Sequence, residues 1–296
     1  MASPELENLV NFLRQMQGQD KTPDPNKLRA GLEQMAAMVP ADEDISIESE
    51  SAGGVPVEWA DAPGGAADRF LVYFHGGGYA GGSPRTHRDM IARLARATGR
   101  RILAVDYRLA PEHPFPAAVD DAVTAWQWLI RDFGANPKDT AVAGDSAGGG
   151  LTLALLVKLR DAGGPLPAAA VLMSPWADLA VTGPSARDKA EEDPFLTPEG
   201  LRYFSGLYRH DADPEDPLVS PLFADMTGLP PILIQVGERE CLLDDSARLA
   251  EKARAAGVDI TLEVWESMVH VFQGFAAVLP EGQNAIKRIG TYLKQY

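Results

Sequence analysis

From residue 69 to the end of the chain, short apolar runs alternate with helical patterns. The runs are as apolar as strands buried on both faces of a sheet must be. Between them, apolar side chains recur every three or four residues, which predicts amphipathic helices. The expected strands are residues 69–74, 101–106, 140–144, 168–174, 231–236 and 259–265. The expected helices are residues 87–98, 118–133, 147–160, about 244–256 and a last one from about 282. This order indicates an α/β protein with a mostly parallel sheet covered on both faces.

Two stretches depart from this alternation. Apolar residues at helical spacing over 5–16 and 28–39 predict two helices before the first expected strand. Residues 178–225 are rich in Pro, Asp and Glu, with one short helical pattern at 201–208, which indicates an insertion. A chain of 296 residues is long enough for one large or two modest domains. We therefore expect an appendage and an insertion on an α/β core.

The charge and the cysteine content exclude several kinds of partner and site. The 42 acidic and 27 basic residues give a net charge of −15, which repels nucleic acids and anionic membrane surfaces. Cys241 is the single cysteine, so neither an intramolecular disulfide nor a zinc site built from several cysteines can form. The sequence shows no apolar run of membrane-spanning length and no signal-peptide pattern, so we expect a cytoplasmic protein that does not enter a membrane.

Residues 144–148 read Gly-Asp-Ser-Ala-Gly, which matches the pattern G-x-S-x-G. The motif lies between an expected strand and an expected helix. In that context a sharp turn directs the serine hydroxyl out of the sheet, beside the free N–H groups at the start of the helix. We therefore expect Ser146 to be a nucleophile. The structural alternative is an incidental serine in a glycine-rich turn.

A run of glycines, Gly76 to Gly78, follows His75 directly after the first expected strand. Small residues leave backbone N–H groups uncovered, so these groups can hydrogen-bond to a negatively charged oxygen. We expect the N–H groups of Gly76, Gly77 and Ala147 to form an oxyanion hole. Gly78 is expected to supply backbone freedom, and His75 to order the loop through hydrogen bonds.

A serine hydroxyl is a weak nucleophile unless a neighbouring base takes its proton. In folds with this serine motif, the histidine base comes last in the chain, after the nucleophile and the acid. His210 and His270 follow Ser146, and only His270 comes after an expected core strand, 259–265. We expect His270 to be the base. The alternative is a structural histidine whose ring nitrogens are satisfied.

The acid should come from the loop after the preceding strand, 231–236. That loop holds four carboxylates, on Glu238, Glu240, Asp244 and Asp245. The acid must accept the imidazole N–H and stabilise the imidazolium, which either Asp or Glu can do. Asp244 and Asp245 are placed to cap the next helix. We therefore choose Glu240 as the acid, with Asp244 as the alternative.

Three separated stretches carry a resemblance to a known family. They are His75-Gly76-Gly77-Gly78, Tyr107-Arg108-Leu109-Ala110-Pro111-Glu112 and Gly144-Asp145-Ser146-Ala147-Gly148-Gly149. From about residue 40 onward, the chain resembles the bacterial hormone-sensitive-lipase family of esterases (family IV). That family usually carries D-P-L-x-D at the acid position, where this chain has Glu240-Cys241-Leu242-Leu243-Asp244. Glu240 thus takes the place of the family's aspartate. Cys241 replaces the usual proline, and we expect it to be a small packed residue.

The resemblance implies an α/β-hydrolase fold with an eight-stranded sheet and a helical cap. We assign residues 1–45 and 178–225 to the cap, and residues 46–177 and 226–296 to the catalytic domain. The resemblance further implies hydrolysis of carboxylic esters with short or medium acyl chains through an acyl-enzyme. It implies no metal or other cofactor, a small ester as the partner, and frequent homodimers.

Two other functions remain to be weighed. A non-catalytic ligand-binding protein of this fold, like related plant hormone receptors, lacks the base, so His270 argues against it. A lipase acting on long-chain acylglycerols needs an exposed apolar lid, which the acidic, proline-rich insertion does not offer. Tyr79, Trp176, Tyr203 and Leu207 are candidate substrate contacts, with ordinary packing as the alternative.

Overall fold

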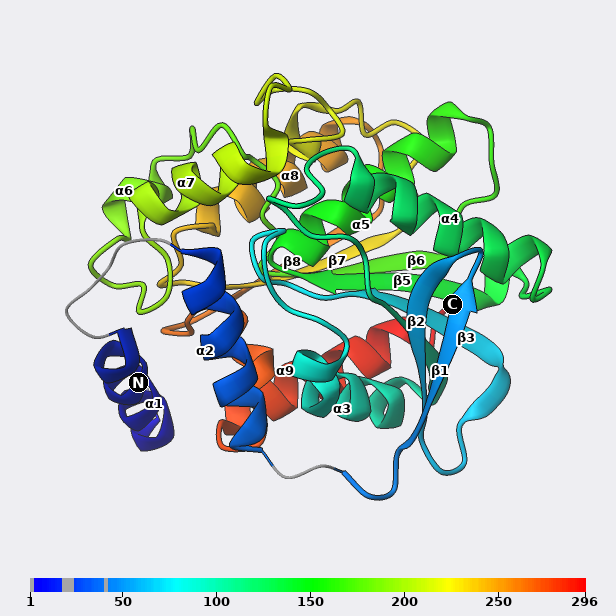
Figure 1. The fold of residues 1–296 in the computed structure, drawn as a ribbon, viewed down its shortest axis with the longest axis horizontal. Helices are drawn as coiled ribbons and strands as arrows, with labels where there is room; N and C mark the ends of the chain where they lie inside the picture. Colours follow the sequence, from blue (N-terminus) through cyan, green and yellow to red (C-terminus); the bar gives the residue numbers. More distant parts are fainter. Residues whose placement is uncertain (1–2, 18–23, 40–41) are drawn as a thin grey trace.

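One eight-stranded sheet forms the centre of the molecule. The structure is a computed structural model that describes residues 3–17, 24–39 and 42–296. The strand order is β1-β2-β4-β3-β5-β6-β7-β8 (Figure 1). The pairings of β2 with β1 and with β4 are antiparallel, and all others are parallel. The strands are β1 (Ser46–Ala52), β2 (Val55–Asp61), β3 (Ala66–Phe74), β4 (Arg100–Val105), β5 (Thr140–Asp145), β6 (Ala169–Met173), β7 (Ile232–Gly237) and β8 (Ile260–Trp265). The expected α/β-hydrolase fold is confirmed.

The hairpin of β1 and β2 was not predicted from the apolar pattern. β1 lies at the edge of the sheet and is exposed at every residue except Ala52, so it has no apolar alternation. β2 contains Pro56, which cannot donate a ladder hydrogen bond and is uncommon in strands. The available signal was the turn Gly53-Gly54, where both residues have positive φ.

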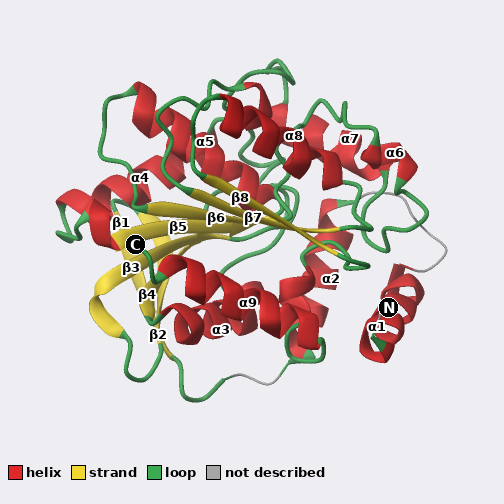
Figure 2. Cartoon of the chain, turned by 180° about the vertical axis from the view of Figure 1, so that it is seen from behind, coloured by secondary structure: helices red, strands yellow, loops and turns green. Residues whose placement is uncertain are grey.

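Helices cover both faces of the sheet (Figure 2). α3 (Arg88–Thr98) and α9 (Pro280–Leu293) lie on one face and pack against each other. α4 (Ala117–Arg131), α5 (Ala147–Asp161) and α8 (Leu243–Ala255) lie on the other face. Each face has its own apolar core. The helices expected between the strands are therefore all present.

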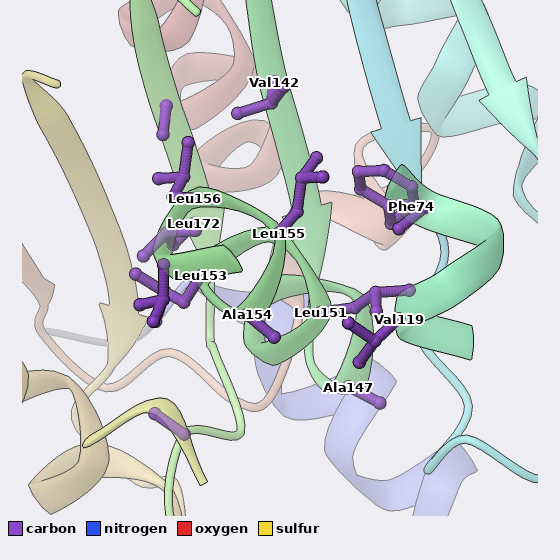
Figure 3. Packing of buried hydrophobic residues seen from close by; sticks show 14 of the residues in the cluster. Phe74, Val119, Val142, Ala147, Leu151, Leu153, Ala154, Leu155, Leu156 and Leu172 are labelled. Carbon is purple, nitrogen blue, oxygen red and sulfur yellow. The ribbon is translucent and has the colours of Figure 1, made fainter. Parts of the chain in front are cut away.

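α5 holds the serine motif in place because it is buried on nearly every side. Its apolar side chains pack among those of β3, β5, β6 and α4 (Figure 3). At the first turn, a Cβ on Gly148 would lie 2.0 Å from the carbonyl oxygen of Phe74. Glycine at this position therefore lets the start of α5 approach the end of β3, which leads into the glycine loop.

The two segments assigned to the cap hold α1 (Pro4–Gln17), α2 (Pro25–Ala37), α6 (Ser185–Asp188) and α7 (Pro198–Arg209). α1 buries Leu6, Leu9, Val10 and Leu13 in a cluster that includes Phe272, in the connection between β8 and α9. Within the described ranges, no helix has both the length and the apolar character needed to cross a membrane.

Arg29 fastens α2 to the rest of the molecule. Its guanidinium donates to the carbonyl oxygens of Ala80, at 2.8 Å, and Ala110, at 3.1 Å. It also forms a bidentate pair with Glu112, at 2.8 and 2.7 Å. Glu112 is the last residue of the second motif in the sequence, and this contact gives it a structural use.

Candidate active site

The backbone of Ser146 is in a conformation that L-residues rarely adopt. Ser146 connects β5 to α5 with φ 51° and ψ −120°. Its N–H donates to the carbonyl oxygen of Met173 at 2.8 Å, and its own carbonyl accepts from the Trp176 N–H at 2.9 Å. A Cβ on Gly144 would lie 2.2 Å from the carbonyl oxygen of Gly148, so this turn closes only with glycine there. These contacts hold a strained turn that presents the hydroxyl.

Ser146, His270 and Glu240 form one continuous hydrogen-bonded chain. The Ser146 Oγ is 2.9 Å from His270 Nε2, and His270 Nδ1 is 2.8 Å from Glu240 Oε2. All three side chains are buried. They follow β5, β8 and β7, whose carboxyl ends meet at one edge of the parallel sheet, where open α/β folds bind ligands.

The carboxylate of Glu240 is held on both sides. Its Oε1 accepts from the Gly237 N–H and from the Ser174 hydroxyl, both at 2.6 Å. Ser174 Oγ in turn accepts from the N–H of Val271 at 3.1 Å. The other oxygen, Oε2, is thereby directed at the imidazole of His270.

Asp244 takes no part in this chain of contacts. Its Oδ2 accepts from the Ser185 N–H at 2.7 Å, away from the imidazole. The expectation that Asp244 and Asp245 cap α8 is wrong. Leu242 precedes the helix, with no side-chain cap, and Asp245 accepts from the N–H groups of Ala177 and Asp178. Both carboxylates fasten the segment after β6 onto α8.

Two opposing influences act on the imidazole of His270. Burial lowers its pKa, but the hydrogen bond and the charge of Glu240 raise it, helped by the charges of Asp193 and Asp145. The net pKa lies above the usual histidine value of 6.5. The surroundings of His270 therefore favour the charged, imidazolium form of its ring.

The glycine loop differs from expectation at Gly76. Its N–H donates to Asp145 Oδ1 at 2.9 Å, so this group is already engaged and Gly76 is not available as an oxyanion donor. Gly77 and Gly78 line the same cavity as Ser146. In the described part of the chain, no hydrogen bond engages the N–H of either residue. The N–H of Ala147, as the first residue of α5, has no partner within the helix.

His75 and Asp145 hold the glycine loop in place through contacts with Gly76. His75 Nδ1 lies 2.8 Å from the Gly76 carbonyl oxygen, and the ring stacks on Tyr107 with centroids 4.2 Å apart. Burial lowers the pKa of His75 to about 3, so its ring is neutral. The Tyr73 hydroxyl donates to Asp145, the carboxylate that also accepts from Gly76. Sequence reasoning missed Asp145, the variable second residue of the serine motif, because only the folded chain shows what it holds.

Known proteins share this architecture. The family model described as the α/β-hydrolase fold matches residues 71–274. An acetyl-hydrolase from Streptomyces hygroscopicus is 42% identical over 99% of this chain and 97% of its own length. An esterase from Acinetobacter venetianus is 39% identical over 90% of this chain and 88% of its own. The crystal structure of an esterase from the bacterial hormone-sensitive lipase family is 48% identical, covers 100% of this chain and 99% of its own, and has a TM-score of 0.96.

This chain belongs to the bacterial hormone-sensitive-lipase family of α/β hydrolases. It is accordingly a carboxylic ester hydrolase. The family resemblance that three short motifs suggested is thus confirmed over nearly the whole chain.

In this hydrolase, Ser146 and His270 line a cavity of about 1660 Å³. Trp176 lies in the same lining, and the segments assigned to the cap supply most of the apolar wall. The apolar residues from the cap segments include Leu9, Phe12, Leu28, Leu32, Met35, Phe195, Leu196, Leu201 and Phe204. Such a wall suits the apolar part of a small ester.

Of the four candidate substrate contacts, only Trp176 lines this cavity. Tyr79 is buried and stacks on Tyr208, with ring centroids 3.7 Å apart, so it packs within the core. Tyr203 and Leu207 lie on α7 but do not line the cavity: Tyr203 is exposed and Leu207 packs against the main apolar core. Sequence reasoning missed Phe195 and Phe204. The signal that could have identified Phe204 is its helical spacing from Leu201, which places both residues on one apolar face of α7.

No metal site is evident in the described ranges. They contain no group of three or more His, Cys, Asp or Glu side chains that could hold an ion. Cys241 is buried beside Glu240, with its Sγ 3.5 Å from the Leu196 carbonyl oxygen. Burial raises the pKa of its thiol, which is therefore protonated at neutral pH.

Proposed function

We propose that this protein is a serine carboxylesterase in which Ser146 is the nucleophile, His270 the base and Glu240 the acid. The observation that carries the proposal is the pair of hydrogen bonds, of 2.9 and 2.8 Å, that links the three side chains of this triad, of which Ser146 and His270 line the cavity. We further propose that Gly77, Gly78 and Ala147 donate to the oxyanion.

The first step forms the acyl-enzyme. Ser146 Oγ attacks the ester carbonyl carbon while His270 Nε2 takes the hydroxyl proton. Negative charge moves to the carbonyl oxygen, where the three N–H groups stabilise it. As the tetrahedral intermediate collapses, the carbon–oxygen bond to the alcohol breaks and His270 returns its proton to the leaving oxygen. Glu240 stabilises the imidazolium throughout.

The second step releases the acid. A water molecule, deprotonated by His270, attacks the acyl carbon, and the same N–H groups receive the second oxyanion. The bond to Ser146 Oγ then breaks, and the proton on His270 returns to the serine. The carboxylic acid product leaves through the cavity.

Short and medium acyl chains are the substrates that we propose. One relative is named an acetyl-hydrolase, and a solved structure that is 45% identical was soaked with p-nitrophenyl butyrate. We propose that the protein acts on such small esters in the cytoplasm, as a homodimer, rather than on long-chain acylglycerols. The histidine base argues against a receptor that only binds its ligand.

Replacing the nucleophile tests the proposal. We expect Ser146→Ala to abolish turnover of p-nitrophenyl butyrate. The variant should keep the near-ultraviolet circular dichroism spectrum of the wild type, which shows that it is folded. A panel of p-nitrophenyl esters from acetate to palmitate then gives the chain-length preference. Full activity of a folded Ser146→Ala variant would contradict the assignment of the nucleophile, and a preference for palmitate would contradict the assignment of the substrate class.

A further inference from the structure

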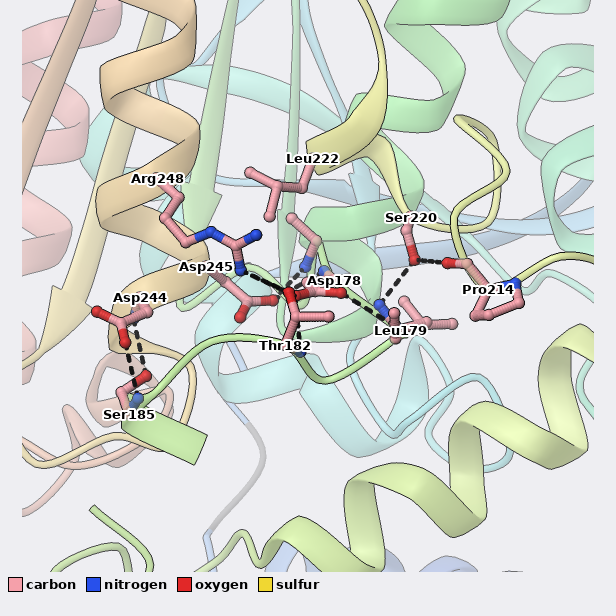
Figure 4. Close-up of polar contacts among 12 residues, drawn as sticks. Asp178, Leu179, Thr182, Ser185, Pro214, Ser220, Leu222, Asp244, Asp245 and Arg248 are labelled. Atoms are coloured by element: carbon pink, nitrogen blue, oxygen red, sulfur yellow. Dashed lines mark hydrogen bonds and ion pairs between the residues drawn. The ribbon is translucent and has the colours of Figure 1, made fainter. Parts of the chain in front are cut away.

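Two residues of the insertion hydrogen-bond to the backbone of Cys241, the residue that follows the proposed acid, Glu240. Asp193, in the loop before α7, accepts the N–H of Cys241 with its Oδ2 at 2.8 Å. Ser185, the first residue of α6, donates its hydroxyl to the carbonyl oxygen of Cys241 at 2.7 Å. Cys241 directly follows Glu240, so the position of Glu240 depends on two residues of the insertion. Figure 4 shows Ser185 and its contacts with Asp244 at the start of α8.

The same carboxylate also organises the cavity wall. Oδ1 of Asp193 accepts the N–H groups of Phe195, at 2.8 Å, and Leu196, at 3.0 Å. Both of these residues line the cavity. The Phe195 ring meets the imidazole of His270 edge-on, with centroids 6.5 Å apart. One buried side chain thus connects the substrate wall with the loop that carries the acid.

We propose that Asp193 is a positioning residue, which sets the alignment of Glu240 with His270 and couples it to the wall formed by Phe195 and Leu196. The proposal rests on the assignment of Ser146, His270 and Glu240 to the proposed function. Asp193 touches no reacting atom. It acts through the peptide group that joins Glu240 to Cys241, while Ser185 holds the next peptide group, which joins Cys241 to Leu242.

The burial of Asp193 separates this arrangement from an ordinary turn. Asp213, in the same insertion, accepts the N–H of Glu215 in a similar local turn but is exposed, and this hydrogen bond stays within its own turn. Asp193 is 6% exposed and accepts three N–H groups from two separate segments. Burial of His270 lowers the pKa of its imidazole, and the charge of Asp193 acts together with Glu240 to raise it.

The decisive variant is Asp193→Asn. An amide of the same shape offers one acceptor oxygen instead of two, so it cannot accept from the turn and from Cys241 together. Functional serines are first counted with diethyl p-nitrophenyl phosphate, which phosphorylates the serine oxygen and releases one p-nitrophenolate per site. We expect kcat per counted site to fall about 10- to 100-fold, because small displacements of catalytic groups cause rate losses of this size. We also expect the acidic limb of kcat/KM to move to lower pH, because His270 loses support for its charged form.

Ser185→Ala and Asp213→Asn complete the experiment. Ser185→Ala leaves every charge in place and releases the carbonyl of Cys241, one peptide group further from Glu240, so we expect a smaller fall in kcat in the same direction. Asp213→Asn should match the wild type. If Asp193→Asn yields no folded protein, the kcat of Ser185→Ala decides the matter.

The outcomes that overturn the proposal are distinct from those that overturn the proposed function. Wild-type kcat and an unmoved acidic limb in folded Asp193→Asn would show that the residue only shapes the loop. In the absence of that variant, wild-type kcat in Ser185→Ala would do the same. Activity in Ser146→Ala would instead remove the proposed function itself.

Discussion

At the scale of single residues, the chemistry depends on which groups are already engaged. One carboxylate oxygen of Glu240 accepts hydrogen bonds from Gly237 and Ser174, and the other faces His270. Asp145 engages the N–H of Gly76, which leaves the next two glycines facing the cavity. In both cases, hydrogen bonds to one set of groups decide which groups remain free.

The raised pKa of His270 gives a pH dependence with a definite sign. The base must be neutral to take the serine proton, and its pKa lies above 6.5. We expect kcat/KM to be low in acid and to rise with pH through a midpoint above 6.5. Titrating the acid released from ethyl butyrate at constant pH measures this without the ionisation of a nitrophenol. A midpoint below 6.5 would show that burial outweighs Glu240.

The identity of the acid can be tested with two matched amides. Glu240→Gln keeps the shape of the side chain but removes the charge that stabilises the imidazolium, so we expect kcat to fall about 10²- to 10⁴-fold. Asp244→Asn should retain most of the activity because Asp244 contacts Ser185 instead of His270. Steady-state kinetics of the two variants side by side give the answer. If the larger loss occurs in Asp244→Asn, the assignment of Glu240 is wrong.

Sequence patterning predicted where the site residues would lie better than it predicted their hydrogen bonds. Ser146, Glu240 and His270 each follow a recognisable strand, so chain order and the sheet edge were sufficient to bring them together. The error at Gly76 could not be avoided in this way. The N–H that remains free is decided by Asp145, which lies 69 residues further along the chain.

At the scale of whole elements, close approach between backbones sets strict limits on side-chain size. In α9, a Cβ on Gly290 would lie 2.2 Å from the carbonyl oxygen of Ala97 at the end of α3. In α7, a Cβ on Gly206 would meet nothing within 4 Å. There is therefore no room for a larger side chain at Gly290, whereas at Gly206 there is room for one.

Alanine at these two positions should shift stability in opposite directions. Gly290→Ala pushes α9 away from α3, and we expect a loss of at least about 1–3 kcal/mol, as in other overpacked sites. Gly206→Ala fits without contact and should stabilise α7 by about 0.5–1 kcal/mol, since glycine is a poor helix former. Thermal unfolding of both variants measures this. A raised Tm for Gly290→Ala would show that the α3–α9 contact is looser than described.

The elements that patterning predicted are those whose burial leaves a recognisable arrangement of apolar residues in the sequence. The parallel strands are continuous apolar runs because helices cover both of their faces. β1 could not be predicted in this manner because its side chains face solvent at the edge of the sheet. α6 has only four residues, too few to show a helical period.

At the scale of the whole molecule, the segments assigned to the cap are fastened at separate places. α1 packs its apolar face near α9, and α2 is held by Arg29 at the carbonyls of Ala80 and Ala110. The insertion is held on α8, where Arg248 pairs with Asp178 (Figure 4). The cavity lies between these attachments, so its shape depends on all of them.

The attachment of α2 should matter for substrate binding more than for chemistry. Arg29→Met keeps most of the apolar part of the side chain but loses the charged hydrogen bonds to Ala80, Ala110 and Glu112. We expect KM for p-nitrophenyl butyrate to rise about tenfold or more, with a smaller change in kcat, because Arg29 contacts no triad residue. Arg187→Met, which removes an exposed pair with the adjacent Asp188, is the matched control. A fall in kcat with an unchanged KM would instead indicate a link between α2 and the triad.

Cys241 gives this molecule an internal reporter. It is the single thiol of the chain, it is buried where the insertion meets α8, and burial raises its pKa. A disulfide reagent such as 5,5′-dithiobis(2-nitrobenzoate) should therefore react only with molecules in which the packing of the insertion around Cys241 has opened. The labelling rate of the folded wild-type protein then measures how often that opening occurs, with no engineered probe. An ester analogue bound in the cavity should slow the labelling in proportion to the time for which it keeps the insertion closed.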